Sequence, residues 1–78
     1  MNKHILLVMK WLKDRDSVSQ EELEKNKREA WAGDAPATSA YTATRATCND
    51  AANAGYWVDI YFERTGEDKD EYLKELER

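Results

Sequence analysis

The first stretch of the chain places its apolar residues at the spacing of one helical face. Between residues 3 and 13 the apolar positions recur at intervals of three or four, and the lysines fall on the other side. Asn2 stands immediately before this segment, where a capping side chain is expected. The pattern predicts an amphipathic helix over residues 3–13, with an apolar face made of Ile5, Leu6, Met9 and Leu12.

A capping box marks the start of a second helix. In this motif a serine and a glutamate three residues later each accept a hydrogen bond from the other's backbone amide. Ser19 and Glu22 stand in this relationship, and Val18 and Leu23 supply the hydrophobic contact that accompanies it. We therefore predict a helix over residues 20–32.

The central segment carries few charges and repeats small residues at helical spacing. Asp34 and Pro36 suit a helix start. Only the modest helix propensity of the threonines argues against a single helix over residues 35–65, and the alanines offset it. The alternative is a break at Cys48–Asp50, with Asn49 capping a second helical segment.

The end of the chain predicts one more short helix. Asp68 and Glu71 form an acidic helix start, which predicts a helix over residues 69–77. No β-hairpin signal competes with these helices. The sequence therefore predicts an all-α protein with a single helical domain over residues 1–78. It would have three or four helices, arranged as a helical hairpin or small bundle with one long central-to-C-terminal helix.

The length of the central helix favours self-association. A helix over residues 35–65 would be about 45 Å long, whereas a compact domain of this size is about 30 Å across. The core is also small, because Ile, Leu, Val and Phe number only 12 of 78 residues. We predict a homo-oligomer, most simply a two-fold dimer, and the alternative is a monomeric bundle with a kinked third helix. The self-associating residues would be Tyr41, Thr44, Cys48, Ala51, Gly55 and Val58.

Composition and charge argue against several classes of protein. The net charge is −4, and basic residues are interleaved with acidic ones, unlike a nucleic-acid-binding surface. The longest apolar run has five residues, far short of the ~20 that span a membrane. One cysteine and one histidine cannot form a structural zinc site, and a lone cysteine favours a reducing compartment. We expect no enzyme activity, metal, cofactor, nucleic acid or membrane partner, and a cytoplasmic location.

Aromatic residues gather late in the central segment, and helical spacing places them on more than one face. Trp57 and Tyr61 share a face, while Phe62 lies nearer to Val58. One set should enter the core and the other should be exposed, where Trp and Tyr are typical binding anchors. The alternative is that the domain or its dimer covers them all. The candidate partner-binding residues are Trp31, Tyr56, Trp57 and Tyr61.

A polar stripe follows the helical spacing of the same segment. Hydroxyl and amide groups around a lone guanidinium suit an anionic ligand such as a nucleotide phosphate, and the alternative is a solvated helix face. The stripe consists of Thr38, Thr42, Arg45 and Asn49. Cys48 lies one turn from Arg45 but is expected to serve packing, and His4 is expected to be solvated.

Four phrases along the chain support a resemblance. They are Met1–His4, Ser17–Leu23, Gly55–Val58 and Tyr61–Gly66, and they resemble small accessory proteins of tailed bacteriophages. The chain departs from that pattern in a threonine-rich stretch over residues 38–47. The resemblance implies a bacterial cytoplasm and a host-directed or anti-defence role exerted by binding. The leading hypothesis is thus an inhibitor of a host or anti-phage defence protein, and the alternative is an oligomeric protein that binds or sequesters a nucleotide-type ligand.

Overall fold

Asn2 begins the first helix in the manner that the sequence predicts. The computed structural model describes residues 1–33 and 39–78. The Asn2 side chain accepts hydrogen bonds from the amides of His4 and Ile5, at 2.9 and 3.2 Å, and helix α1 runs over Lys3–Lys13. A short 3₁₀ turn, η1, follows over Arg15–Ser17.

The capping box forms at the start of helix α2, which runs over Gln20–Gly33. The Ser19 hydroxyl accepts from the Glu22 amide at 3.1 Å, and the Ser19 amide donates to the Glu22 carboxylate at 3.5 Å. Val18 and Leu23 are both buried beside it. A purely local motif is enough to fix this helix start, because all its partners lie within a few residues of one another.

The prediction of one helix over residues 35–65 is wrong, and the alternative break near Cys48–Asp50 is confirmed. Helix α3 covers Ser39–Asn49, the 3₁₀ turn η2 covers Ala51–Asn53, and helix α4 covers Ala54–Thr65. Asn49 is the last residue of α3, and the residues that precede η2 and α4 at their N-cap positions are Asp50 and Asn53, not Asn49. Asp50 leaves the helical conformation, with φ −153° and ψ 66°. Its carboxylate accepts a hydrogen bond from the side-chain amide of Asn53 at 2.6 Å.

Packing explains why the central helix breaks. The turn brings α4 into contact with α3, so that Ala43, Ala46, Ala54 and Val58 become buried. One straight helix could not have made the contacts between α3 and α4, which are the most numerous between any two helices of the described chain. The expected helix start at Asp34 and Pro36 lies outside the described residues.

Gly66 ends α4 in the left-handed conformation, at φ 73°, which a glycine adopts at little steric cost. Asp68 then caps helix α5, Lys69–Leu76, by accepting from the Asp70 amide at 2.9 Å. The all-α prediction is confirmed for the part of the chain that the structure describes. That part contains five α-helices, more than the three or four expected, because the break adds one.

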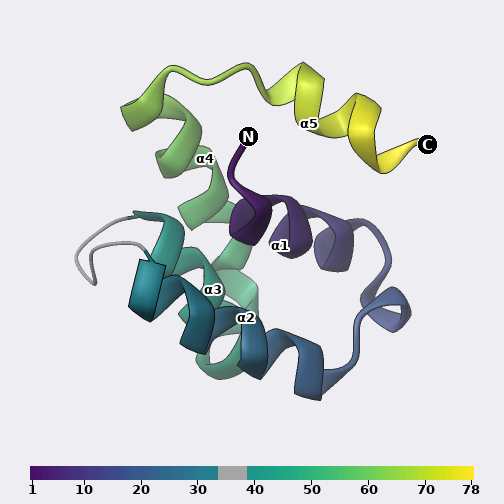
Figure 1. Cartoon of the computed structure of the whole chain (residues 1–78), viewed down its shortest axis with the longest axis vertical. Helices are drawn as coiled ribbons and strands as arrows, with labels where there is room; N and C mark the ends of the chain where they lie inside the picture. Colours follow the sequence, from purple (N-terminus) through teal and green to yellow (C-terminus); the bar gives the residue numbers. More distant parts are fainter. Residues whose placement is uncertain (34–38) are drawn as a thin grey trace.

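Helix α1 is the centre of the arrangement. It lies between α5 on one side and α2 with α3 on the other, and it contacts all four other helices (Figure 1). Its residues Ile5 and Val8 are fully buried, together with Tyr72 of α5. The molecule measures 28 × 26 × 22 Å, so none of the helices described here projects from it. The length argument for a dimer is therefore removed, and homo-oligomerisation stays a prediction.

His4 is buried, so the prediction of a solvated histidine is wrong. Its side chain is 8% exposed, and its Nδ1 lies 2.8 Å from the Oδ1 of Asn26 on α2. The Asn26 amide group also donates to the His4 carbonyl at 3.2 Å. Because Asn26 Oδ1 can only accept, His4 Nδ1 donates. The pair joins α1 to α2 with a contact that no local pattern could reveal.

Candidate binding surfaces

An open groove lies between α1, α4 and α5. Its volume is about 380 Å³, and most of the side chains around it are apolar. The apolar residues are Met9, Leu12, Gly55, Val58, Leu73 and Leu76, and the charged ones are Lys13, Asp59 and Lys69. We call this feature the α1–α4–α5 groove. Among residues 1–33 and 39–78, no helix is long and apolar enough to cross a membrane.

Two helices supply the apolar walls of the groove. Met9 and Leu12 stand one turn apart on α1, and Leu73 and Leu76 stand one turn apart on α5. Val58 of α4 is buried in the core at the same place. Leu73 is 41% exposed, which is high for a leucine with apolar neighbours. The groove therefore offers an apolar surface that the chain itself leaves partly uncovered.

The charges at the groove are unevenly paired. Lys69 Nζ lies 3.0 Å from Asp59 Oδ1, so these two residues compensate each other. Lys13 has no ion pair within the described part of the chain. The groove thus carries one uncompensated positive charge beside its apolar walls.

A cluster of hydrogen bonds holds α5 in place. The Glu67 carboxylate accepts from the Tyr61 hydroxyl at 2.5 Å and also from the Tyr72 hydroxyl. The Tyr72 hydroxyl oxygen in turn accepts a hydrogen bond from the backbone amide of Asn2 at 2.7 Å. The Phe62 and Tyr72 rings meet edge to face, with centroids 4.8 Å apart. The cluster therefore ties α5 to α4 and to the start of α1.

The same cluster shifts the protonation equilibria of its members. Hydrogen bonds from Tyr61 and then Tyr72 hold the pKa of the Glu67 carboxyl below its usual range, although partial burial opposes them. Burial is the largest cause of the raised pKa of both tyrosines, and the hydrogen bond to Glu67 adds to it. Glu67 is therefore charged and both tyrosines are neutral at neutral pH.

The four predicted partner-binding aromatics do not form one exposed set. Trp31 and Tyr56 are 56% and 58% exposed, and Trp57 is half-buried. Tyr61 is only 5% exposed, because its ring packs against Phe62 and its hydroxyl is bonded to Glu67. Assigning Tyr61 to a partner surface is therefore wrong.

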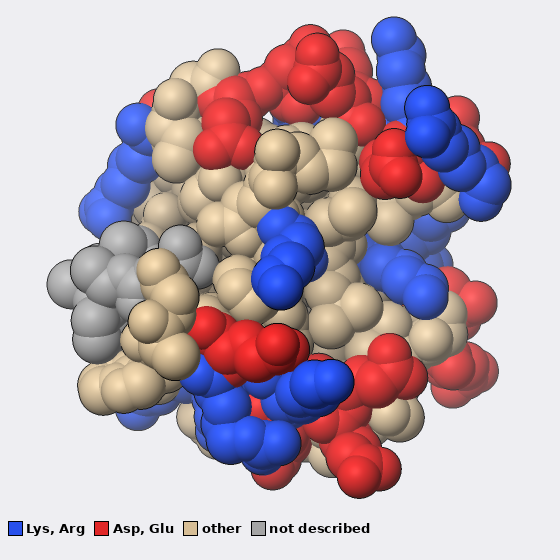
Figure 2. All heavy atoms as spheres, in the orientation of Figure 1, with Lys and Arg blue, Asp and Glu red and all other residues tan. Residues whose placement is uncertain are grey.

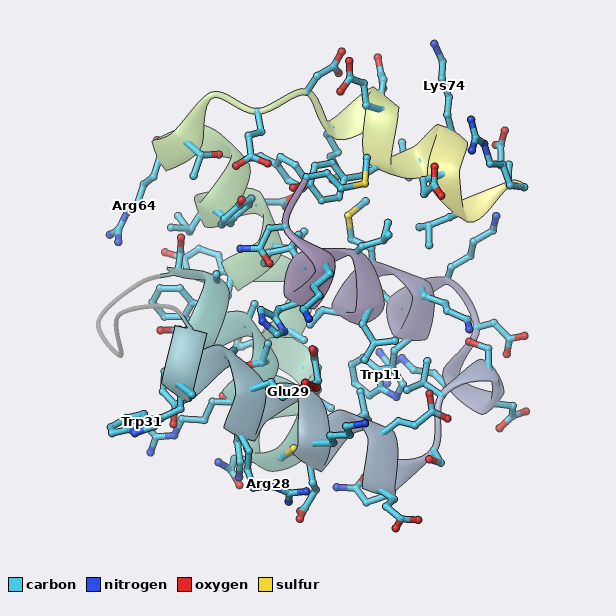
Figure 3. The ribbon with its side chains drawn as sticks, viewed as in Figure 1. Trp11, Arg28, Glu29, Trp31, Arg64 and Lys74 are labelled. Atoms are coloured by element: carbon cyan, nitrogen blue, oxygen red, sulfur yellow. The ribbon has the colours of Figure 1, made fainter. Side chains whose placement is uncertain are left out.

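Trp31 lies on a different side of the molecule from α5. Figure 3 shows it at the edge opposite Lys74, which belongs to α5. Its ring meets the Tyr41 ring edge to face, with centroids 5.1 Å apart. Trp31 therefore cannot contribute to the α1–α4–α5 groove.

Three of the four polar-stripe residues share a second depression, of about 240 Å³, at the junction of α3 and α4. It is lined by Thr42, Arg45, Ala46, Asn49, Asp50 and Trp57. Thr38, the fourth residue of the stripe, lies outside the described residues. Sequence reasoning did not place Trp57 here, because the break near Asp50 is what brings α4 beside α3. We call this feature the α3–α4 depression.

The stripe predicted for self-association serves largely in the packing of the chain itself. Thr44 and Val58 are buried at 0% and 2% exposure, so they are core residues and not an outer surface. The remaining members are half-buried, namely Tyr41, Cys48, Ala51 and Gly55. Cys48 packs against the core, with its sulfur 3.8 Å from the Thr47 hydroxyl.

Sequence reasoning missed the α1–α4–α5 groove, because its residues come from three separate helices. One signal was present in α5: Tyr72 is followed directly by Leu73, and the two residues point to different sides of so short a helix. Tyr72 enters the core but Leu73 does not, so core packing does not account for an apolar residue at position 73.

Charged side chains of both signs lie around the molecule. On the face seen in Figure 2, acidic and basic residues stand side by side around a largely uncharged centre. Over the described residues, 1–33 and 39–78, no group of three or more His, Cys, Asp or Glu side chains is placed to hold a metal ion. No known family, curated protein or solved structure matches the chain.

Proposed function

We propose that the protein is a binding module that docks on another protein through the α1–α4–α5 groove and thereby inhibits it. The observation that carries the proposal is the apolar groove with its partly exposed Leu73. Apolar grooves between helices are a recurring site for the apolar face of a partner's helix. The resemblance to phage accessory proteins supports a host or anti-phage defence protein as the target.

The groove suits a helix of the partner. Its walls are themselves helices with apolar residues one turn apart, which is the spacing that a docked amphipathic helix presents. The unpaired Lys13 favours an acidic residue beside the apolar face of the incoming helix. The proposed occupant is thus an amphipathic helix with an acidic flank.

Binding by a small module can inhibit without chemistry. A helix held in the groove would be withdrawn from its own intramolecular or intermolecular partner. The proposal assigns no catalytic step to any residue of the chain.

Capture with matched variants tests the proposed function. The tagged protein, a Leu73→Lys variant and a Trp31→Lys variant are incubated with bacterial lysate, and captured proteins are quantified by mass spectrometry. Both changes put a lysine in place of an exposed apolar residue, but only Leu73 lies in the groove. We expect a protein that the wild type and Trp31→Lys retain and Leu73→Lys loses. Identical capture by all three, or loss with Trp31→Lys alone, would contradict the proposal.

A further inference from the structure

The α3–α4 depression combines a cation, an amide, a carboxylate and an aromatic ring. Arg45 and Asn49 are exposed on α3, and Trp57 comes from α4, which follows the turn η2. Neither the Arg45 side chain nor the Asn49 side chain has a hydrogen bond or ion pair within the described residues. Both polar groups are therefore available to a ligand at the same place.

The aromatic wall sets one requirement on that ligand. Trp57 is half-buried, and its ring is braced by Tyr56 in an edge-to-face contact with centroids 5.2 Å apart. A braced, partly exposed indole is a surface on which a planar ring can stack. A nucleobase meets this requirement, whereas a simple inorganic anion does not.

The charges set a second requirement. The Arg45 guanidinium offers several donors in a fixed fork, which suits a phosphate. Asp50 lies in the same depression, and its carboxylate already accepts from Asn53 at 2.6 Å. A negative charge in the same depression repels a ligand with several negative charges, and its oxygens can accept from an exocyclic amine of a base. One phosphate is therefore favoured over three.

We infer that the α3–α4 depression binds a nucleoside monophosphate, with its base on Trp57 and its phosphate on Arg45. The amide of Asn49 and the carboxylate of Asp50 would meet the polar edge of the base. The inference is independent of the proposed docking function, because the depression and the α1–α4–α5 groove share no residue. The site lies within one chain, at the break between two helices, and needs no second subunit.

Nuclear magnetic resonance of the indole N–H groups tests the inference. The ¹⁵N-labelled protein is titrated separately with adenosine monophosphate, guanosine monophosphate, adenosine, adenosine triphosphate and inorganic phosphate. Trp57→Phe assigns the Trp57 signal and keeps an aromatic ring at the position. We expect a saturable shift of the Trp57 indole with at least one monophosphate. Binding should be weaker with the nucleoside and the triphosphate and absent with phosphate alone.

Arginine variants supply the matched control. Arg45→Gln should weaken monophosphate binding by at least about tenfold, because it removes a charge-assisted contact. Arg64→Gln removes an exposed arginine near the other end of α4 and should leave binding unchanged (Figure 3). The dispersion of the backbone amide signals shows whether each variant is folded. The inference is overturned if no nucleotide gives a saturable shift, if both arginine variants bind alike, or if inorganic phosphate binds as well as the nucleotide.

Discussion

The Tyr61 hydroxyl donates a hydrogen bond to the Glu67 carboxylate at 2.5 Å, which joins the inner side of α4 to the segment that precedes α5. The Tyr72 hydroxyl of α5 donates to the same carboxylate. One glutamate thus fixes the position of α5, and α5 supplies one wall of the α1–α4–α5 groove. The shape of the groove depends on this cluster.

Replacing the shared carboxylate should weaken the fold. Glu67→Gln keeps the size of the side chain but removes its charge, and the neutral amide accepts less strongly from two hydroxyls. We expect a loss of about 1–2 kcal/mol in the free energy of unfolding, measured by urea denaturation. Glu63→Gln, at an exposed glutamate of α4, is the control and should change stability little. Equal effects of the two variants would show that the hydrogen bonds to Glu67 do not contribute to the free energy of unfolding.

The lowered pKa of Glu67 predicts how the stability of the fold depends on pH in the acidic range. The pKa of this carboxyl is lower in the folded state than in the unfolded state, where it is near 4.3. Such a group adds stability to the fold when the pH is above the unfolded pKa. It loses that contribution as the pH falls through the folded pKa. The stability difference between wild type and Glu67→Gln should therefore be full at pH 7 and shrink below about pH 4. Thermal unfolding across this range measures it. A difference that stays constant down to pH 2 would count against the carboxylate's role.

The buried pair of His4 and Asn26 can be tested by a double-mutant cycle. Asn26→Leu alone leaves the His4 ring N–H buried without its acceptor, and should cost about 1–3 kcal/mol. Adding His4→Leu removes that orphaned donor, so the double variant should be less destabilised than the sum of the two single changes. Chemical denaturation of the four proteins gives the coupling energy. Strict additivity would mean that the two side chains do not interact in solution.

Alanine substitutions distinguish the surface of the groove from the core. Leu73→Ala should cost less than about 1 kcal/mol, because this side chain is already 41% exposed. Ile5→Ala should cost about 2–5 kcal/mol, because Ile5 is fully buried. Urea denaturation compares the two variants. If Leu73→Ala were as costly as Ile5→Ala, Leu73 would be a core residue and the groove would lose its exposed anchor.

Local signals predicted the helix starts well. Asn2, the Ser19–Glu22 box and Asp68 all cap helices as their sequence context indicates, since each motif is complete within a few residues. The break near Asp50 could be foreseen only as an alternative, because local propensity does not count the contacts that α4 gains by folding back on α3.

The candidate sites depended on the same long-range packing. Arg45 and Asn49 could be placed on one helix face from their spacing, but Trp57 joined them only through the break. His4 could not be recognised as buried without knowing that Asn26 of another helix faces it. The groove required three helices to be placed together, so no single stretch of sequence contained it.

Site-specific photocrosslinking in bacterial cells tests the central claim most directly, namely that the α1–α4–α5 groove is the docking surface. A photoreactive amino acid is placed at Leu73 in one variant and at Trp31 in another, and crosslinked products are identified by mass spectrometry. We predict that Leu73 crosslinks to an amphipathic helix of one partner protein and that Trp31 does not. Crosslinking of a partner from Trp31 alone, or no product from Leu73, would contradict the account.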